Sequence, residues 1–153
     1  MTALACDKAL HVLDFHNRKN IEARLPSFSN REKITLKEGS NSIIESIKKE
    51  LKNYFAGNLK NFTTPIQFDG TTFQRCVWQA LLEIPFGEVR NYSEQAHRIK
   101  KPQAFRAVAN ANGKNFLSII VPCHRVINKN GNLGGYGGGI ERKAWLLNHE
   151  KNY

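Results

Sequence analysis

Residues 119–127 have the sequence IIVPCHRVI, and the expected organisation of the chain follows from them. The apolar run before Cys123 is typical of a short buried strand. Pro122 suits the end of such a strand because it cannot donate a backbone hydrogen bond. His124 and Arg125 follow directly, and cationic neighbours lower the pKa of a thiol and make it a nucleophile. The alternative is a small buried cysteine beside two basic surface residues.

The composition is that of one globular domain or two small ones. The chain has 153 residues, of which 41% are hydrophobic and 24% charged, enough for a real core. No apolar run approaches the roughly 20 residues of a membrane span, and the N-terminus lacks a signal-peptide pattern. We therefore expect a cytoplasmic protein, or a nuclear one in a eukaryote, with no membrane partner.

The cysteines predict free thiols. Cys6, Cys76 and Cys123 are odd in number and far apart, which implies no disulfide framework. Cys6 with His11 and His16 matches no zinc-ligand spacing, so we expect no metal site.

The charge favours a polyanionic partner. The chain has 23 Lys and Arg against 13 Asp and Glu, a formal net charge of +10. Between Glu94 and Glu141 there is no acidic residue, and Cys123 lies inside this window. A field of one sign around a nucleophile favours a nucleic-acid substrate over a neutral small molecule. The alternative is a basic surface without a partner. The basic residues of the window are Arg98, Lys100, Lys101, Arg106, Lys114, Arg125 and Lys129.

The first half of the chain shows secondary structure but no chemistry. Residues 9–15 are typical of a strand, and residues 34–36 of a second short one. Ser42 and Glu45 form a capping box that opens an amphipathic helix ending at Gly57. The stretch that follows, with Pro65 and Gly70, is typical of a linker, and a capping box at Thr71 and Gln74 then begins a helix that stops before Pro85.

A helix-turn-helix is predicted next. A capping box at Asn91 opens a short helix to about Ile99, and Pro102 and Gly113 bound a second helix. Small apolar residues form one face of the second helix, and Gln103, Arg106 and Asn110 point the other way. Such a stripe can approach DNA closely. Paired short helices are also common in domains that bind nothing, so the prediction depends on the basic window.

Turn-forming residues follow the cysteine. Asn130-Gly131 predicts a type I′ hairpin between residues 126–127 and Leu133. The glycine-rich stretch 134–139 lacks the lysine of a phosphate-binding loop, so we expect it to line a pocket with Tyr136 projecting. A last helix is expected over residues 141–149.

Residues 73–150 resemble the O6-alkylguanine-DNA alkyltransferase family, the methylated-DNA–protein-cysteine methyltransferases. The PCHRV core is highly specific to that family, and residues 51–62 resemble the end of its N-terminal domain. The matching motifs are VWQALLEIPFGEV at 77–89, Tyr92, RAV at 106–108, IIVPCHRVI at 119–127, GNLGGY at 131–136 and LLNHE at 146–150.

The resemblance implies an α/β fold in two parts. An N-terminal domain with a ribonuclease-H-like sheet is expected over residues 1–66. A mainly helical, winged helix-turn-helix-like domain that binds DNA and accepts the alkyl group is expected over residues 67–153. No cofactor and no metal are implied.

The resemblance also implies the reaction. Cys123 takes the alkyl group from O6 of guanine irreversibly, so each molecule acts once. His124 is the base on a bridging water, and Glu150 orients its imidazole. Asn115 fixes the active-site turn. Tyr92 donates to the leaving guanine and presses on a phosphate.

The implied partner is double-stranded DNA bearing O6-alkylguanine, bound by a monomer through the minor groove, with O4-alkylthymine an open second substrate. Arg106 enters the base stack in place of the flipped nucleotide. The remaining expected DNA contacts are Tyr92, Gln103, Ala107, Asn110 and Arg125, and the expected pocket residues are Tyr136, Gly137, Gly138 and Val126.

Two other classes of protein remain as alternatives. One is a DNA-binding lesion sensor that accepts no alkyl group. The other is a cysteine hydrolase built on Cys123 and His124, although adjacent residues of a strand point in opposite directions, which favours a water relay over direct contact. Ala109 and Phe116 stand where the family commonly has glycine and proline, which puts pocket shape in doubt rather than the reaction.

Overall fold

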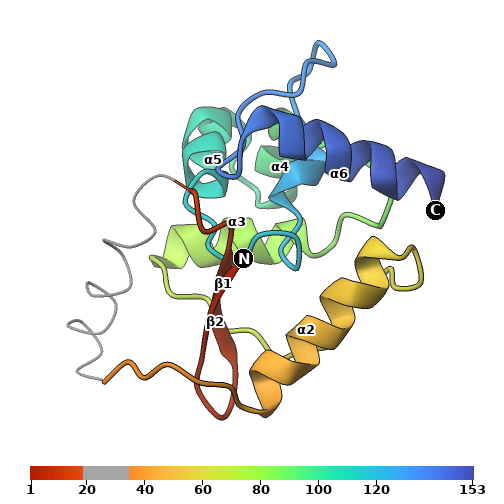
Figure 1. Ribbon diagram of the computed structural model, residues 1–153. Coiled ribbons are helices and arrows are strands. Elements are labelled where there is room, and N and C mark those ends of the chain that lie inside the picture. Colours follow the sequence, from red (N-terminus) through yellow and green to blue (C-terminus); the bar gives the residue numbers. More distant parts are fainter. Residues whose placement is uncertain (19–34) are drawn as a thin grey trace.

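The computed structural model describes residues 1–18 and 35–153 (Figure 1). It is a mixed α/β structure, as predicted. No helix within these two ranges combines the length and apolar character needed to cross a bilayer. The N-terminal elements are β1 (Thr2–Ala5), β2 (Leu10–Asp14) and α2 (Ser42–Phe55). The C-terminal elements are α3 (Thr72–Leu81), β3 (Arg90–Asn91), α4 (Tyr92–Arg98), η1 (Pro102–Ala104), α5 (Phe105–Asn112), η2 (Cys123–Arg125), β4 (Val126–Ile127) and α6 (Ile140–Asn152).

The N-terminal part is a hairpin and a helix. β1 and β2 pair antiparallel, with Thr2 opposite Asp14 and an irregularity between Leu4 and Ala5. The predicted strand over residues 9–15 is confirmed as β2. Of the second predicted strand, Ile34 lies outside the described residues, and residues 35–36 form no strand.

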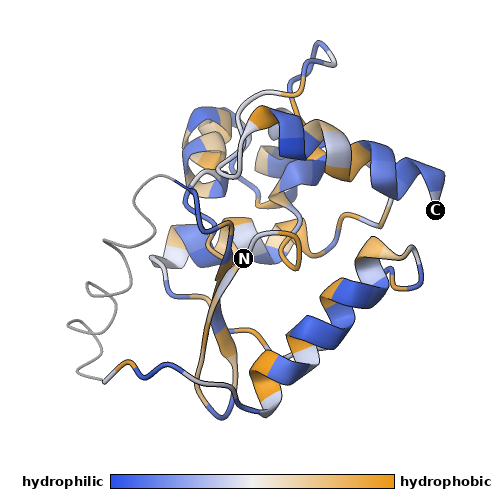
Figure 2. Ribbon diagram, in the orientation of Figure 1, coloured by the Kyte–Doolittle hydropathy of each residue, from blue (hydrophilic) through white to orange (hydrophobic). Residues whose placement is uncertain are grey.

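Helix α2 begins at Ser42, whereas the predicted capping box made Ser42 the N-cap and so placed the start one residue later. Asn41, not Ser42, is the N-cap, and its side chain accepts a hydrogen bond of 3.0 Å from the backbone N–H of Ile44. The helix is amphipathic (Figure 2) and buries Ile43, Ile47 and Tyr54 toward the rest of the molecule.

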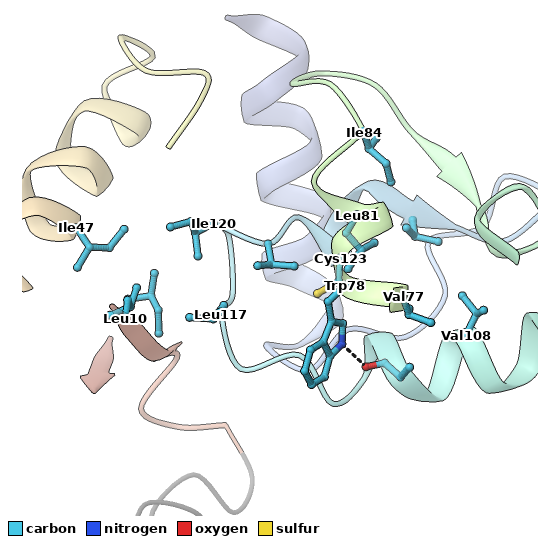
Figure 3. Close-up of a cluster of buried hydrophobic side chains, with 14 of the residues drawn as sticks. Leu10, Ile47, Val77, Trp78, Leu81, Ile84, Val108, Leu117, Ile120 and Cys123 are labelled. Carbon is cyan, nitrogen blue, oxygen red and sulfur yellow. Dashed lines mark hydrogen bonds between the residues drawn. The ribbon is translucent and has the colours of Figure 1, made fainter. Parts of the chain in front are cut away.

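One core connects both parts of the chain. Leu10 and Ile47 from the N-terminal part lie in the same cluster as Leu117, Trp78 and Val108 (Figure 3). Residue 13 of β2 forms a parallel bridge to Leu117, and its backbone bonds to residues 116 and 118 at 2.7 Å each. The N-terminal hairpin is therefore attached directly to the segment that leads to Cys123.

The helices around that segment are capped and cross-linked. The predicted capping boxes at Thr71 and Asn91 are both present. The indole N–H of Trp78 donates to the carbonyl of Ala111 at 2.8 Å, which joins α3 to α5 (Figure 3). Since α3 and α4 both pack on α5, the helix that carries Arg106 has a fixed orientation.

The strand predicted before Cys123 is wrong, because strand pairing in this region is confined to residues 126–127, after the cysteine. Residues 119–121 form a buried turn, and Ile119 has φ 73°, a left-handed conformation unusual for a β-branched residue. These residues are apolar because the turn lies in the core. A short apolar run does not distinguish a buried turn from a buried strand. Similarly, a turn forms at Asn130-Gly131, but β4 pairs with β3 in parallel and Leu133 is in no strand.

Candidate active site

Cys123 opens η2 at the end of the buried turn and is 8% exposed. The side-chain amide of Asn115 donates to Cys123 Sγ at 3.2 Å and to the carbonyl of Val121 at 2.9 Å. The amide oxygen of Asn115 accepts from the backbone N–H of Leu117 at 2.9 Å. One buried amide therefore holds both the turn and the sulfur, as expected for Asn115.

The thiol is less acidic than the sequence implied. Burial raises the pKa of Cys123, and the opposing effects of Asn115, Arg18 and Lys143 do not compensate. The predicted net lowering of the Cys123 pKa is therefore wrong, because burial outweighs the cations. A buried thiol that stays protonated needs a base before it can act as a nucleophile.

His124, the next residue in the chain, has a ring nitrogen that can accept a proton. Its ring is fully buried, and its Nε2 lies 2.8 Å from Glu150 Oε1. Burial lowers the pKa of His124 despite the hydrogen bond to Glu150, so the ring is neutral near pH 7. Because the ionised Glu150 accepts a hydrogen bond, Nε2 carries the ring proton and Nδ1 is an acceptor. Within the described residues, this buried Nδ1 has no hydrogen-bond partner.

Glu150 is held ionised by several donors. Burial alone would raise the pKa of Glu150, but hydrogen bonds from His124 and Arg125 hold it well below its usual range. Arg125 donates through Nε at 2.8 Å and Nη2 at 3.0 Å. Tyr54 Oη and the N–H of Gly87 donate at 2.7 and 3.2 Å. These hydrogen bonds fix the positions of both carboxylate oxygens of Glu150.

Arg125 does not have the expected role in DNA contact. It is 6% exposed, and its remaining Nη1 donates to the carbonyl of Ile84 at 2.6 Å. Because its guanidinium is occupied by Glu150 and this carbonyl, we reassign Arg125 as a positioning residue for Glu150.

A cavity of about 340 Å³ opens onto the sulfur, a volume typical of small-molecule sites. Expected residues Tyr136 and Gly137 line it, whereas Gly138 and Val126 do not. Val126 is fully buried in β4, and Phe15 lies against Gly138. The full lining is Tyr92, Ala109, Asn110, Asn112, Gly113, Cys123, Gly135, Tyr136 and Gly137.

Lys143 is a site residue that the sequence did not reveal. It is fully buried, and its Nζ donates to the carbonyls of Val126 at 2.5 Å, of Leu133, and of Gly135 at 3.3 Å. Burial lowers its pKa to about 8. Lys143 therefore ties the glycine-rich stretch to β4, and no local pattern marks a buried lysine on a helix.

Arg18 was also missed. It pairs with the buried Asp14 and donates to the carbonyl of Asn115 at 2.5 Å and of Gly113 at 2.6 Å. Its guanidinium lies 5.2 Å from the ring centre of Phe116. Arg18 thus fastens the residues on both sides of the active-site amide to the N-terminal part, across nearly a hundred residues of sequence.

The outer face of α5 continues from the cavity. Gln103, Arg106, Ala107 and Asn110 are all exposed, and Asn110 also lines the cavity. Tyr92, half-buried at the start of α4, also lines the cavity. Two of the expected contact residues, Tyr92 and Asn110, therefore line the cavity, and Arg106 and Ala107 are exposed on the helix that carries Asn110. In residues 1–18 and 35–153, no group of three or more His, Cys, Asp or Glu side chains could hold a metal ion.

Two family models match the chain. The DNA-binding domain of 6-O-methylguanine DNA methyltransferase matches residues 72–152, and its ribonuclease-like domain matches residues 1–68. The inducible methylated-DNA–protein-cysteine methyltransferase of Bacillus subtilis is 54% identical over 102 residues, 67% of this chain. The methylated-DNA–protein-cysteine methyltransferase of Mycobacterium bovis is 55% identical over 103 residues, also 67% of this chain. These matches span 57% and 62% of the two relatives.

Solved structures agree with the family models. The crystal structure of Mycobacterium tuberculosis OGT in complex with DNA has a TM-score of 0.83 and 41% identity, and covers 98% of this chain and 85% of that one. The O6-methylguanine-DNA methyltransferase of Pyrococcus kodakaraensis has a TM-score of 0.71 and 25% identity, and covers 97% and 88%. The likeness extends over both parts of the chain.

Proposed function

The chain belongs to the 6-O-methylguanine DNA methyltransferase family, and from this premise we propose that it repairs DNA by moving the alkyl group of O6-alkylguanine irreversibly onto its own Cys123. One observation carries the proposal. A buried thiol lies at a cavity of about 340 Å³, beside a neutral histidine whose other ring nitrogen is held by Glu150. This arrangement suits nucleophilic attack on a small group that enters the cavity.

In the proposed step, a water bridges Cys123 and Nδ1 of His124. The thiol proton passes through this water to Nδ1 while the sulfur attacks the alkyl carbon. The S–C bond forms, the C–O6 bond breaks, and its electron pair stays on guanine. Glu150, ionised and fixed, stabilises the imidazolium that forms.

Tyr92 supports the departure of guanine. It lines the cavity, and burial and the nearby Cys123 raise its pKa, so its phenol stays protonated and can donate to the leaving base. The thioether that results has no leaving group at neutral pH. Each molecule of protein therefore acts once, without a cofactor.

The outer face of α5 is the proposed DNA contact. A base inside a duplex cannot reach a buried sulfur, so the nucleotide must be flipped. Exposed Arg106 would fill the vacated stack, and the small Ala107 allows the helix to enter the minor groove. Gln103 and Asn110 would contact the backbone. The net charge of +10 supports binding to the phosphates.

The resemblance to the family also bears on the oligomeric state, the cellular location and the domain boundary. We propose a monomer, as the resemblance to the family implies. The protein would act where the chromosome lies, in the cytoplasm or in a eukaryotic nucleus. We propose a domain boundary between residues 66 and 67, which is close to the gap between the two family matches over residues 1–68 and 72–152.

Intact-protein mass spectrometry tests the reaction. After incubation with a duplex carrying one O6-methylguanine, the protein should gain one methyl group in place of one hydrogen. The modification should map to the peptide that contains Cys123 and be absent from Cys123→Ala. Tight binding without a mass gain would indicate a lesion sensor instead, and repeated release of a small product would indicate a hydrolase.

A further inference from the structure

Three side chains outside this site are joined in a row, two from the N-terminal hairpin and one from the segment that pairs with β2 at residue 66. Cys6 Sγ lies 3.4 Å from His11 Nε2, and His11 Nδ1 lies 2.7 Å from Asp69 Oδ2. The backbone N–H of Lys8 also donates to Cys6 Sγ at 3.4 Å. A nucleophile, a base and a carboxylate that orients the base are therefore connected by hydrogen bonds, in the order that activated nucleophiles require.

Backbone pairing builds this row. Cys6 directly follows β1 and His11 is the second residue of β2, so the last register pair of the hairpin, Ala5 with Leu10, brings them together. Leu10 also forms a parallel bridge to Ile66, with backbone hydrogen bonds of 2.8 and 2.9 Å to the neighbouring residues 65 and 67. This pairing carries Asp69 to the far side of the imidazole.

The electrostatic surroundings of Cys6 favour its reactive thiolate form. The N–H of Lys8 and the ring of His11 lower the pKa of Cys6. Burial opposes protonation of His11, but its hydrogen bonds to Cys6 and Asp69 raise its pKa. Both shifts favour a thiolate paired with an imidazolium over a neutral pair. The side chains of His11 and Asp69 are 17% and 19% exposed, whereas Cys6 is open to solvent.

We propose that Cys6 is a second alkyl-accepting thiol, which takes alkyl groups directly from small carbon electrophiles in solution rather than from DNA. The substrates are alkyl halides or sulfonate esters. His11 Nε2 takes the thiol proton, the sulfur forms an S–C bond with the electrophilic carbon, and the halide or sulfonate leaves with the electrons of the broken bond. The proton on His11 then passes to water. This reaction does not depend on alkyl transfer at Cys123.

The chain contains its own comparison thiol. Cys76 is exposed like Cys6, but no hydrogen bond to its sulfur exists within the described residues. A difference in reactivity between Cys6 and Cys76 therefore measures the effect of His11 and Asp69 rather than exposure.

The test is site-resolved alkylation of the full chain. Chelator-treated protein is reacted with iodoacetamide for timed intervals at several pH values, and the peptides of Cys6, Cys76 and Cys123 are quantified by mass spectrometry. At about pH 6, Cys6 should react on the order of tenfold faster than Cys76, because the N–H of Lys8 and the ring of His11 stabilise the Cys6 thiolate. Methyl methanesulfonate should give S-methylation at Cys6 with the same preference.

Two variants test the mechanism. His11→Gln should remove the advantage of Cys6 at low pH, and Asp69→Asn should reduce it, while Cys76 reacts at an unchanged rate and so reports that the fold is intact. Equal rates and equal pH midpoints for Cys6 and Cys76 would overturn the proposal, as would an unchanged Cys6 rate in His11→Gln. Alkylation of Cys6 only after chelator treatment would indicate a metal-held thiol and overturn it too.

Discussion

Tyr54 donates a hydrogen bond of 2.7 Å to Oε1 of Glu150, which lies 96 residues further along the chain. Tyr54 is fully buried, and burial together with Glu150 raises the pKa of its phenol, so it remains a donor at every physiological pH. The same carboxylate oxygen lies 2.8 Å from His124. Helix α2 of the N-terminal part therefore contacts the relay beside Cys123 directly.

Tyr54→Phe should slow alkyl transfer several-fold without changing DNA affinity. The substitution removes one donor to a buried charge, and such a hydrogen bond is worth about 1.5–3 kcal/mol. Single-turnover kinetics on a duplex with O6-methylguanine measure the rate, and urea unfolding measures the stability. Tyr153→Phe, at an exposed tyrosine, is the control. An unchanged transfer rate would remove Tyr54 from the relay.

Glu150→Gln should weaken the pH dependence of stability in acid. The folded pKa of Glu150 lies below its ordinary value, near 4.3. Between these two values the unfolded chain binds a proton that the folded chain does not. The free energy of unfolding therefore falls as the pH drops below about 4. Denaturant titrations at pH 7 and about pH 3 should show a smaller loss in the variant. The same loss in both proteins would contradict the assignment.

The same variant should slow transfer at neutral pH while DNA binding stays nearly unchanged. A neutral amide still accepts a hydrogen bond from His124 but does not stabilise the imidazolium. Transfer rates equal to those of the unmodified protein would show that Glu150 is not part of the relay.

Asn115→Ala should raise the pKa of Cys123 further and lower the stability. Asn115 is the amide that donates to the sulfur and opposes the effect of burial on its pKa. Losing the amide oxygen of Asn115 leaves the buried backbone N–H of Leu117 without its acceptor, at a cost of about 1–3 kcal/mol. The rate of reaction with free O6-benzylguanine, followed against pH, should move to a higher midpoint. A midpoint at the original pH would mean that Asn115 acts only on the turn.

Arg106→Ala should impair repair of duplex DNA far more than reaction with free O6-benzylguanine. Arg106 is exposed on α5 and does not line the cavity, so it bears on the flipping of the nucleotide rather than on the chemistry. Lys48→Ala is the charge-matched control, because Lys48 is exposed on α2. Equal losses on both substrates would refute the assignment of Arg106 to the base stack.

Local patterns in the sequence predicted much of this molecule correctly. The capping boxes at Thr71 and Asn91 and strand β2 formed as expected, because each depends on residues only a few positions apart. The motifs around Cys123 and Glu150 identified two members of the site, which the fold joins through His124. The apolar run at 119–121 failed as a strand, since burial in a turn and burial in a sheet require the same side chains.

Tertiary structure alone decided the electrostatics. The sequence places His124 and Arg125 beside Cys123 and implies an acidic thiol. In the folded protein, desolvation in the core outweighs the lowering effects of Asn115, Arg18 and Lys143 and raises the pKa of Cys123. Arg125 has the positive charge expected of a DNA contact, yet in the folded protein its buried guanidinium donates to Glu150. The sequence shows which charged residues are adjacent along the chain. The removal of water from a thiol, and the partner that a buried charge finds, depend on residues brought together from far along the chain.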